Sequence, residues 1–163
     1  MFRYLASCLA LVSMVLLVAC EEDPNATPTP TATSTASGLS IYLSLFYPRV
    51  TTDDFELVEV ERVIPDTPRV GTAALELLIE GPTPAEESQL GIFDPIPDGT
   101  RLLSLNIVDR VATADFSAEI LNYGGGSLNV RAITGMIEAT LKQFPTVDSV
   151  VLLVEGQPDQ IQP

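Results

Sequence analysis

The side chains that could carry chemistry in this 163-residue chain are carboxylates, a few tyrosines and two cysteines. The chain has no histidine, which excludes most hydrolytic triads, histidine-ligated zinc sites and haem. Cys8 and Cys20 both lie in the first twenty residues, so the rest of the chain holds no thiol. Disulfides, cysteine nucleophiles and thiolate metal sites are therefore excluded there. The sequence predicts no catalytic residue, no metal site and no cofactor.

Two pairs of adjacent acids, Asp53–Asp54 and Glu86–Glu87, are the candidates for carboxylate chemistry. A glycosidase needs two carboxyl groups held about 5–10 Å apart across a cleft, whereas adjacent acids in loops are normally solvated. With 22 acidic and 8 basic residues, such pairs also occur by composition alone. Calcium would suit oxygen ligands in residues 94–99, but the Asp-x-Asp-x-Asp-Gly spacing is absent. Carboxylate catalysis and calcium binding are therefore minor alternatives.

Three tyrosines supply the alternative of ligand binding. Tyr42, Tyr47 and Tyr123 could stack on sugars, and the loop over residues 83–100 could form the rim of such a site. The simpler interpretation is that tyrosines at strand ends anchor the edge of a sheet. A cell-wall glycan or muropeptide is thus the second candidate partner. Nucleic acid is excluded, because a formal net charge of −14 leaves no cationic face for phosphates.

The first twenty residues have the features of a targeting segment. After Arg3, an apolar run at residues 5–18 is too short to cross the roughly 30 Å hydrocarbon core comfortably. The run ends in Leu-Val-Ala-Cys20, which resembles the lipobox of bacterial lipoproteins. We therefore expect a signal peptide over residues 1–19 and diacylglycerol on Cys20, which anchors the chain at the extracytoplasmic face of the membrane. An uncleaved anchor or an ordinary signal peptide with a chance cysteine is the alternative.

Residues 21–38, EEDPNATPTPTATSTASG, contain no large apolar side chain and are predicted to be disordered. Eighteen such residues span roughly 24 Å as a flexible coil and up to about 56 Å as polyproline II. Residues 20–38 are therefore predicted to form a lipidated tether. Loss of Arg3 with the signal peptide changes the net charge from −14 to −15. That charge repels anionic lipid headgroups and would steer a basic partner surface toward the domain.

The elements that position these side chains begin at Leu39, where the composition changes. Strands are predicted at residues 39–46, 55–64, 101–108, 111–116 and 149–154, and helices at residues 67–80 and from Ser127 or Asn129 to residue 144. The order β-β-α-β-β-α-β predicts an α+β fold. We expect one domain over residues 39–158, with two helices packed on a mixed sheet, followed by a tail at residues 159–163.

Both predicted helices have apolar faces and boundary signals. Thr67 and Pro68 suit the N-cap and first position of the first helix, and Gly81-Pro82 ends it. The faces consist of Ala74, Leu75, Leu78 and Ile79 in the first helix, and Ile133, Met136, Ile137, Thr140, Leu141 and Phe144 in the second.

The strands differ in their patterns. Residues 55–64 have no cleanly apolar face, which is typical of an edge strand or a long hairpin arm. Asp109–Arg110 joins two strands tightly and predicts a hairpin. The continuous apolar run at residues 149–154 is typical of a central strand covered on both faces.

Five stretches in this order together resemble the GerMN domain, the sporulation and spore germination module. They are RVIP (62–65), AALELLIEGP (73–82), IPDGTRL (96–102), VATADFS (111–117) and TLKQFPTVDSVVLLVEG (140–156). The resemblance spans residues 39–158 and implies a small α+β module of bacterial envelope lipoproteins. In sporulating relatives it implies a link to assembly of a trans-envelope complex. The family carries no established catalytic residues, so the resemblance transfers none.

The residues of these motifs favour structural roles. Gly81 is interpreted as a helix stop, Asp98–Gly99 as a turn and Gly156 as the end of the last strand, while Asp115 caps the turn after its strand or binds a ligand. The predicted function is a lipid-anchored, non-catalytic envelope module that acts through protein–protein contacts, in sporulation or germination or in envelope complex assembly. The alternative is a module that binds cell-wall glycan or muropeptide.

Overall fold

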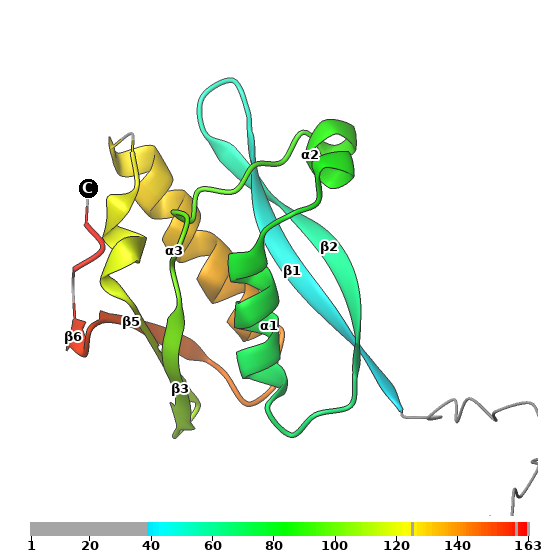
Figure 1. Ribbon diagram of the computed structural model, residues 1–163, viewed down its shortest axis with the longest axis vertical. Coiled ribbons are helices and arrows are strands. Elements are labelled where there is room, and N and C mark those ends of the chain that lie inside the picture. The colour runs from blue at the N-terminus through cyan, green and yellow to red at the C-terminus, as the bar shows by residue number, and fades with distance from the viewer. Residues whose placement is uncertain (1–38, 125, 159, 163) are drawn as a thin grey trace, which may run out of the picture. The chain divides into compact units, whose positions relative to one another are not determined.

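The computed structural model describes residues 39–124, 126–158 and 160–162, which form two sheets joined through packed helices (Figure 1). The elements in chain order are β1 (Ser40–Val50), β2 (Phe55–Pro65), α1 (Val70–Glu80), α2 (Pro84–Leu90), β3 (Leu102–Val108), β4 (Val111–Phe116), the 3-10 helix η1 (Ala118–Asn122), α3 (Gly126–Lys142), β5 (Ser149–Val154) and β6 (Gln157–Pro158). Helices α1 and α3 each contact both sheets. The predicted α+β class is confirmed, and in these described ranges no helix is long and apolar enough to cross a membrane.

Strands β1 and β2 form a long antiparallel hairpin that is paired along its full length. Successive side chains of a strand point to opposite faces, and Leu43, Leu45 and Tyr47 accordingly point inward and are buried. A hairpin alone is marginally stable in water, so this face must pack on other elements, here α1 and α3. The prediction of a hairpin arm over residues 55–64 is confirmed.

The side chains of Thr140 on α3 and of Gln143, which directly follows this helix, occupy the outer edge of β1. The Gln143 amide accepts a hydrogen bond from Ser44 N (2.9 Å) and donates one to Ser44 O (2.7 Å). Thr140 Oγ1 accepts from Phe46 N at 3.3 Å. An open strand edge is a template for pairing with another chain. At Ser44 and Phe46 of β1, the side chains of Gln143 and Thr140 therefore satisfy backbone groups that such a chain would bind.

We expect Gln143→Leu to lower the free energy of unfolding by about 2 kcal/mol, because it leaves the partly buried N–H and C=O of Ser44 without their partners. Urea denaturation followed by circular dichroism measures the change. Gln89→Leu, at an exposed position on α2, is the matched control and should stay within about 0.5 kcal/mol of the wild type. Equal losses in the two variants would contradict this role of Gln143.

The second sheet has the strand order β3-β4-β5-β6, with β3 and β4 antiparallel and β4 and β5 parallel. Asp109 (φ 49°) and Arg110 (φ 65°) both have positive φ and form the two-residue turn of the β3–β4 hairpin. Positive φ at both central positions matches the right-handed twist of the strands. The hairpin that the sequence predicts at these residues is confirmed.

The core lies between the two sheets, and α3 supplies much of it. The predicted face of α3 is confirmed, with Phe144 just beyond the helix and partly buried. Ala74, Leu75 and Leu78 of α1 are also buried, while Ile79 is half-buried. The largest fully buried side chains are Tyr47, Phe116, Leu43, Leu45, Leu75, Leu78, Ile120, Ile133, Met136, Ile137, Leu141 and Thr140.

The sheets differ from the prediction in two respects. The strands form two sheets rather than one mixed sheet, because the hairpin packs on helices and does not pair with β3–β6. Strand β5 is not covered on both faces, since α3 packs on one face only and Val151 on the other is 40% exposed.

The helices also differ from the prediction. The loop expected at residues 83–100 contains α2, and η1 and the short β6 were not expected. Helix α1 begins at Val70, because Thr67 Oγ1 accepts from Arg69 N (3.2 Å) in a turn that precedes the helix. Helix α3 begins at Gly126, and the Asn129 amide donates to the carbonyl of Gly124.

Candidate interaction surfaces

A groove of about 500 Å³ lies between the end of β2 and α1, and we call it the β2–α1 groove. It is lined by Ile64, Pro65, Asp66, Thr67, Ala73, Glu76, Leu77 and Glu80. The four residues from α1 recur at helical spacing and therefore form one stripe of the helix. The four from β2 and the following loop form the opposite wall.

Two hydrogen bonds hold the walls of the β2–α1 groove. Asp66 N donates to Leu39 O at 2.8 Å, which closes the end of the hairpin where β2 leaves the sheet. Tyr47 Oη donates to the carbonyl of Leu77 at 3.3 Å, which connects β1 to the floor of the groove. Burial raises the pKa of the Tyr47 phenol, so this hydroxyl keeps its proton. The groove is therefore a feature of the packed fold.

The rim of the β2–α1 groove is acidic. Asp66, Glu76 and Glu80 are exposed, and within the described part of the chain none of them has an ion pair within 4 Å. Arg62, on β2, instead forms two hydrogen bonds to Glu86 at 2.6 and 2.8 Å. Among the described residues, the groove thus combines an apolar floor with three acids that form no ion pair.

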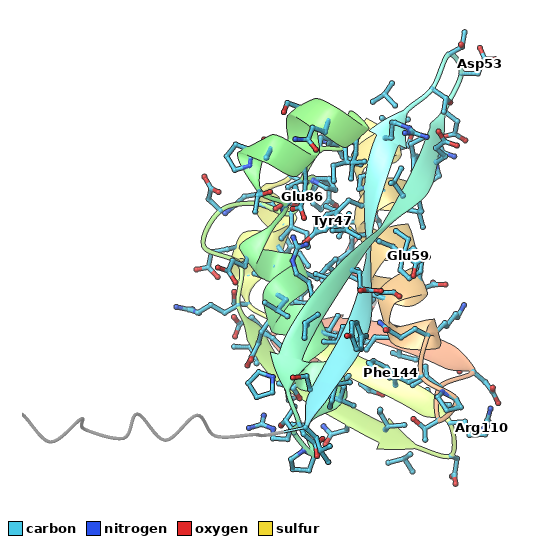
Figure 2. The ribbon with its side chains drawn as sticks, turned by 90° about the vertical axis from the view of Figure 1, so that its right-hand side faces the viewer. Tyr47, Asp53, Glu59, Glu86, Arg110 and Phe144 are labelled. Atoms are coloured by element: carbon cyan, nitrogen blue, oxygen red, sulfur yellow. The ribbon has the colours of Figure 1, made fainter. Side chains whose placement is uncertain are left out.

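Glu86 has a structural role that explains its low pKa. Hydrogen bonds from Arg62, together with those from Thr83, lower the pKa of the Glu86 carboxyl to about 2. The Thr83 hydroxyl and the Glu86 carboxylate form a capping box that begins α2. Glu86 and Tyr47 lie on the same side of the hairpin (Figure 2). The acid pair Glu86–Glu87 therefore does not act as a unit, since Arg62 and Thr83 engage its first member.

The acid pair at the hairpin tip is divided in the same way. Asp54 accepts two hydrogen bonds from Arg131 of α3, at 2.9 and 3.0 Å, while Asp53 is exposed at the tip (Figure 2). The Arg131 guanidinium also lies 5.7 Å from the centre of the Phe55 ring, within range of a cation–π interaction. This pair fastens the hairpin to α3, and the two acids do not face each other across a cleft.

The three tyrosines do not form a stacking platform. Tyr42 is 67% exposed, whereas Tyr47 is fully buried and points to the opposite face of β1. Tyr123 follows η1, and its hydroxyl donates to the carbonyl of Gln162 at 2.6 Å. Tyr47 and Tyr123 each fasten one segment to another, but neither lies at a strand end and anchors a sheet edge as the simpler interpretation expects.

Asp94 is the most perturbed acid of residues 94–99. Its Oδ1 accepts from Ile96 N at 2.8 Å, and its carboxylate lies against Gly81 at the end of α1. Burial, together with the charges of Asp98 and Glu87, raises the pKa of this carboxyl to about 6. The described residues contain no group of three or more His, Cys, Asp or Glu side chains that could hold a metal ion.

We expect Asp94→Asn to stabilise the protein at pH 7 by about 2 kcal/mol, because the amide keeps the acceptor for Ile96 N but cannot ionise. The folded-state pKa of about 6 lies above the ordinary value of 3.8, so the folded state binds more protons between these values. Wild-type stability therefore falls as the pH rises from about 4 to 6, and the variant lacks this fall. Urea denaturation between about pH 4 and 7 measures the stability of the wild type and of Asp94→Asn. Parallel pH profiles of the two proteins would contradict the raised pKa of Asp94.

The remaining predicted residues have structural roles. Asp115 Oδ1 accepts from Gly156 N at 3.0 Å, so it caps the turn after β5 and not, as expected, the turn after its own strand. Gly156 follows β5 in that turn, Asp98–Gly99 forms a turn and Gly81 ends α1, all as predicted. Cys20, the signal peptide over residues 1–19 and the tether to residue 38 lie outside the described residues.

The fold and the surface together describe a small α+β module with an acidic rim around the β2–α1 groove. A family model described as Germane: Sporulation and spore germination matches residues 44–160. Because this match covers most of the chain, the protein belongs to that family, and the predicted resemblance to GerMN domains is confirmed. No curated protein matched the sequence.

Two solved structures from Bacillus subtilis share the fold. The tandem GerMN domains of the sporulation protein GerM align with a TM-score of 0.58 and 25% identity, over 76% of this chain and 43% of that chain. The first GerMN domain of GerM aligns with a TM-score of 0.57 and 27% identity, over 72% of this chain and 85% of that chain. The present chain therefore spans less than half of the tandem structure.

Proposed function

We propose that this protein is a lipid-anchored, non-catalytic module of the bacterial cell envelope that acts through protein–protein contacts in sporulation, germination or assembly of an envelope complex. The observation that carries this proposal is the family match over residues 44–160. Solved relatives from this family are domains of a sporulation protein. The lipobox at Cys20 and the tether that follows it support attachment to the extracytoplasmic face of the membrane.

The arrangement of the acids supports a role other than catalysis. Glu86 and Asp54, one from each candidate acid pair, accept hydrogen bonds from arginines of neighbouring elements. Glycosidase chemistry instead requires two carboxyl groups that face a substrate from opposite sides of a cleft. The β2–α1 groove offers shape and charge, which suit recognition of another protein.

The test is co-purification from native membranes after mild crosslinking, with partners identified by mass spectrometry. A stoichiometric envelope protein that is recovered with the wild type supports the proposal. Cys20→Ala is the control; it should leave the protein out of the detergent phase in phase partition and lose the partner. Recovery of cell-wall fragments alone would favour the glycan alternative, and turnover of an envelope substrate by the purified protein would contradict a non-catalytic role.

A further inference from the structure

We infer that the β2–α1 groove binds a cationic amphipathic segment of a partner protein, whose apolar side chains enter the groove while its lysines or arginines meet the rim. This inference rests on the proposed function, because a module that acts through contacts needs a surface for its partner.

The floor of the groove fits apolar side chains. Ile64, Ala73 and Leu77 are half-buried and contribute apolar surface on both walls. The volume of about 500 Å³ falls within the range of about 300–1,000 Å³ that is typical of ligand pockets. Amphipathic segments bind by placing apolar residues from one face into a groove of this kind. The floor therefore favours a partner segment that has apolar side chains along one face.

The rim determines the charge of the occupant. Asp66 lies on one wall, and Glu76 and Glu80 lie one helical turn apart on the other. The guanidinium of Arg62 is held by Glu86, so it attracts Glu80 without forming an ion pair with it. Complementary charges steer a partner to its site and exclude like-charged ones. An anionic lipid surface or an acidic peptide is therefore disfavoured here.

A second copy of this chain does not fit the groove. Its net charge of −14 repels the same surface. Among the described residues, the basic side chains are paired with acids of the same chain, apart from Arg69 at the start of α1. The folded chain therefore presents no free cationic stripe, and the occupant must come from a different protein.

The test uses the full-length protein in neutral detergent micelles and fluorescence anisotropy with labelled synthetic helices. The probe has leucine on one face and lysine on the other. Two further helices replace lysine with glutamate or leucine with serine. The groove variant is Glu76→Gln/Glu80→Gln, and the control is Asp53→Asn/Glu61→Gln. All four side chains are exposed and the charge change is equal, but Asp53 is at the hairpin tip and Glu61 lies on the outer face of β2.

We expect the leucine–lysine helix to bind the wild type and the control equally, and to bind the groove variant about fivefold more weakly. The glutamate and serine helices should not bind. Photo-reactive leucine in the probe should crosslink to residues 64–67 or 73–80. Equal weakening in both variants, crosslinks elsewhere, binding of the serine helix, or binding of phosphatidylglycerol vesicles at the groove would each overturn the inference.

The two proposals fail in different ways. If the envelope protein recovered by crosslinking still binds the Glu76→Gln/Glu80→Gln variant with wild-type affinity, the inference about the groove is wrong and the contact function stands. If no envelope protein is recovered from membranes, the proposed function fails even where the synthetic helix binds.

Discussion

Replacing Phe116 with alanine is expected to lower the free energy of unfolding by about 4 kcal/mol. Phe116 is fully buried at the end of β4, opposite Leu102 of β3 and beside Val154 of β5. Truncation removes most of its apolar surface and leaves a cavity that these neighbours, fixed by strand pairing, cannot fill. Because small domains are marginally stable, a loss of this size would leave a large fraction of the protein unfolded.

Urea denaturation followed by circular dichroism measures this loss. Phe93→Ala is the matched control, because the same side chain is removed from a half-buried position where the backbone bond from Phe93 N to Pro48 O is kept. Phe93→Ala should lower the free energy of unfolding by less than half as much as Phe116→Ala does. Equal losses would mean that the contacts at the end of β4 contribute no more than a partly exposed ring.

The second large effect is expected at Gly81, where substitution by alanine should lower the free energy of unfolding by about 3 kcal/mol. Gly81 has φ 88° and ψ 175°, a region of backbone space that is essentially restricted to glycine. A Cβ atom there would lie 2.8 Å from Oδ2 of Asp94, whose carboxylate is held by the N–H of Ile96. Backbone strain and steric contact therefore act together at the end of α1.

Thermal and urea denaturation of Gly81→Ala measure the cost, and Gly124→Ala is the control. A Cβ at Gly124 meets no atom within 4 Å, so that substitution should change stability by less than about 1 kcal/mol. Introducing Gly81→Ala into an Asp94→Ala background separates the two causes. Relative to the Asp94→Ala single variant, the loss of stability should shrink only by the steric part, and no remaining loss would show that backbone strain contributes nothing.

Signals that lie close together in the sequence predicted their elements well. The apolar face of α3, the turn at Asp109–Arg110 and the glycine that ends α1 each depend on residues within about three helical turns or one hairpin. The capping box of α2 was also visible as Thr83-Pro-Ala-Glu86, which is a helix start signal. It was missed because proline, glycine and aspartate in residues 83–100 favour a loop.

The division into two sheets and the β2–α1 groove could not be predicted in this way. Both depend on where elements distant in sequence are placed relative to one another. The bonds between Ser44 and Gln143 join residues 99 positions apart, and no local pattern indicates that a glutamine will occupy a strand edge. Nothing in the sequence distinguishes the acids of the groove rim from other surface acids, because only the packing of α1 beside the end of β2 brings them together.

The edge of β1 has a mechanical consequence if the preceding chain is held at a membrane, as we propose. Any pull on the domain then enters at Leu39. The β2–α1 groove lies at the same end of the hairpin, so a load carried from Leu39 to a partner in the groove opens the pairing of β1 with β2 from that end, and the side-chain bonds of Gln143 and Thr140 to Ser44 and Phe46 lie further along the strand. The bond from Asp66 N to Leu39 O lies first in that path. The end of the hairpin beside the β2–α1 groove is thus the part of the domain on which a pull from the preceding chain would act first.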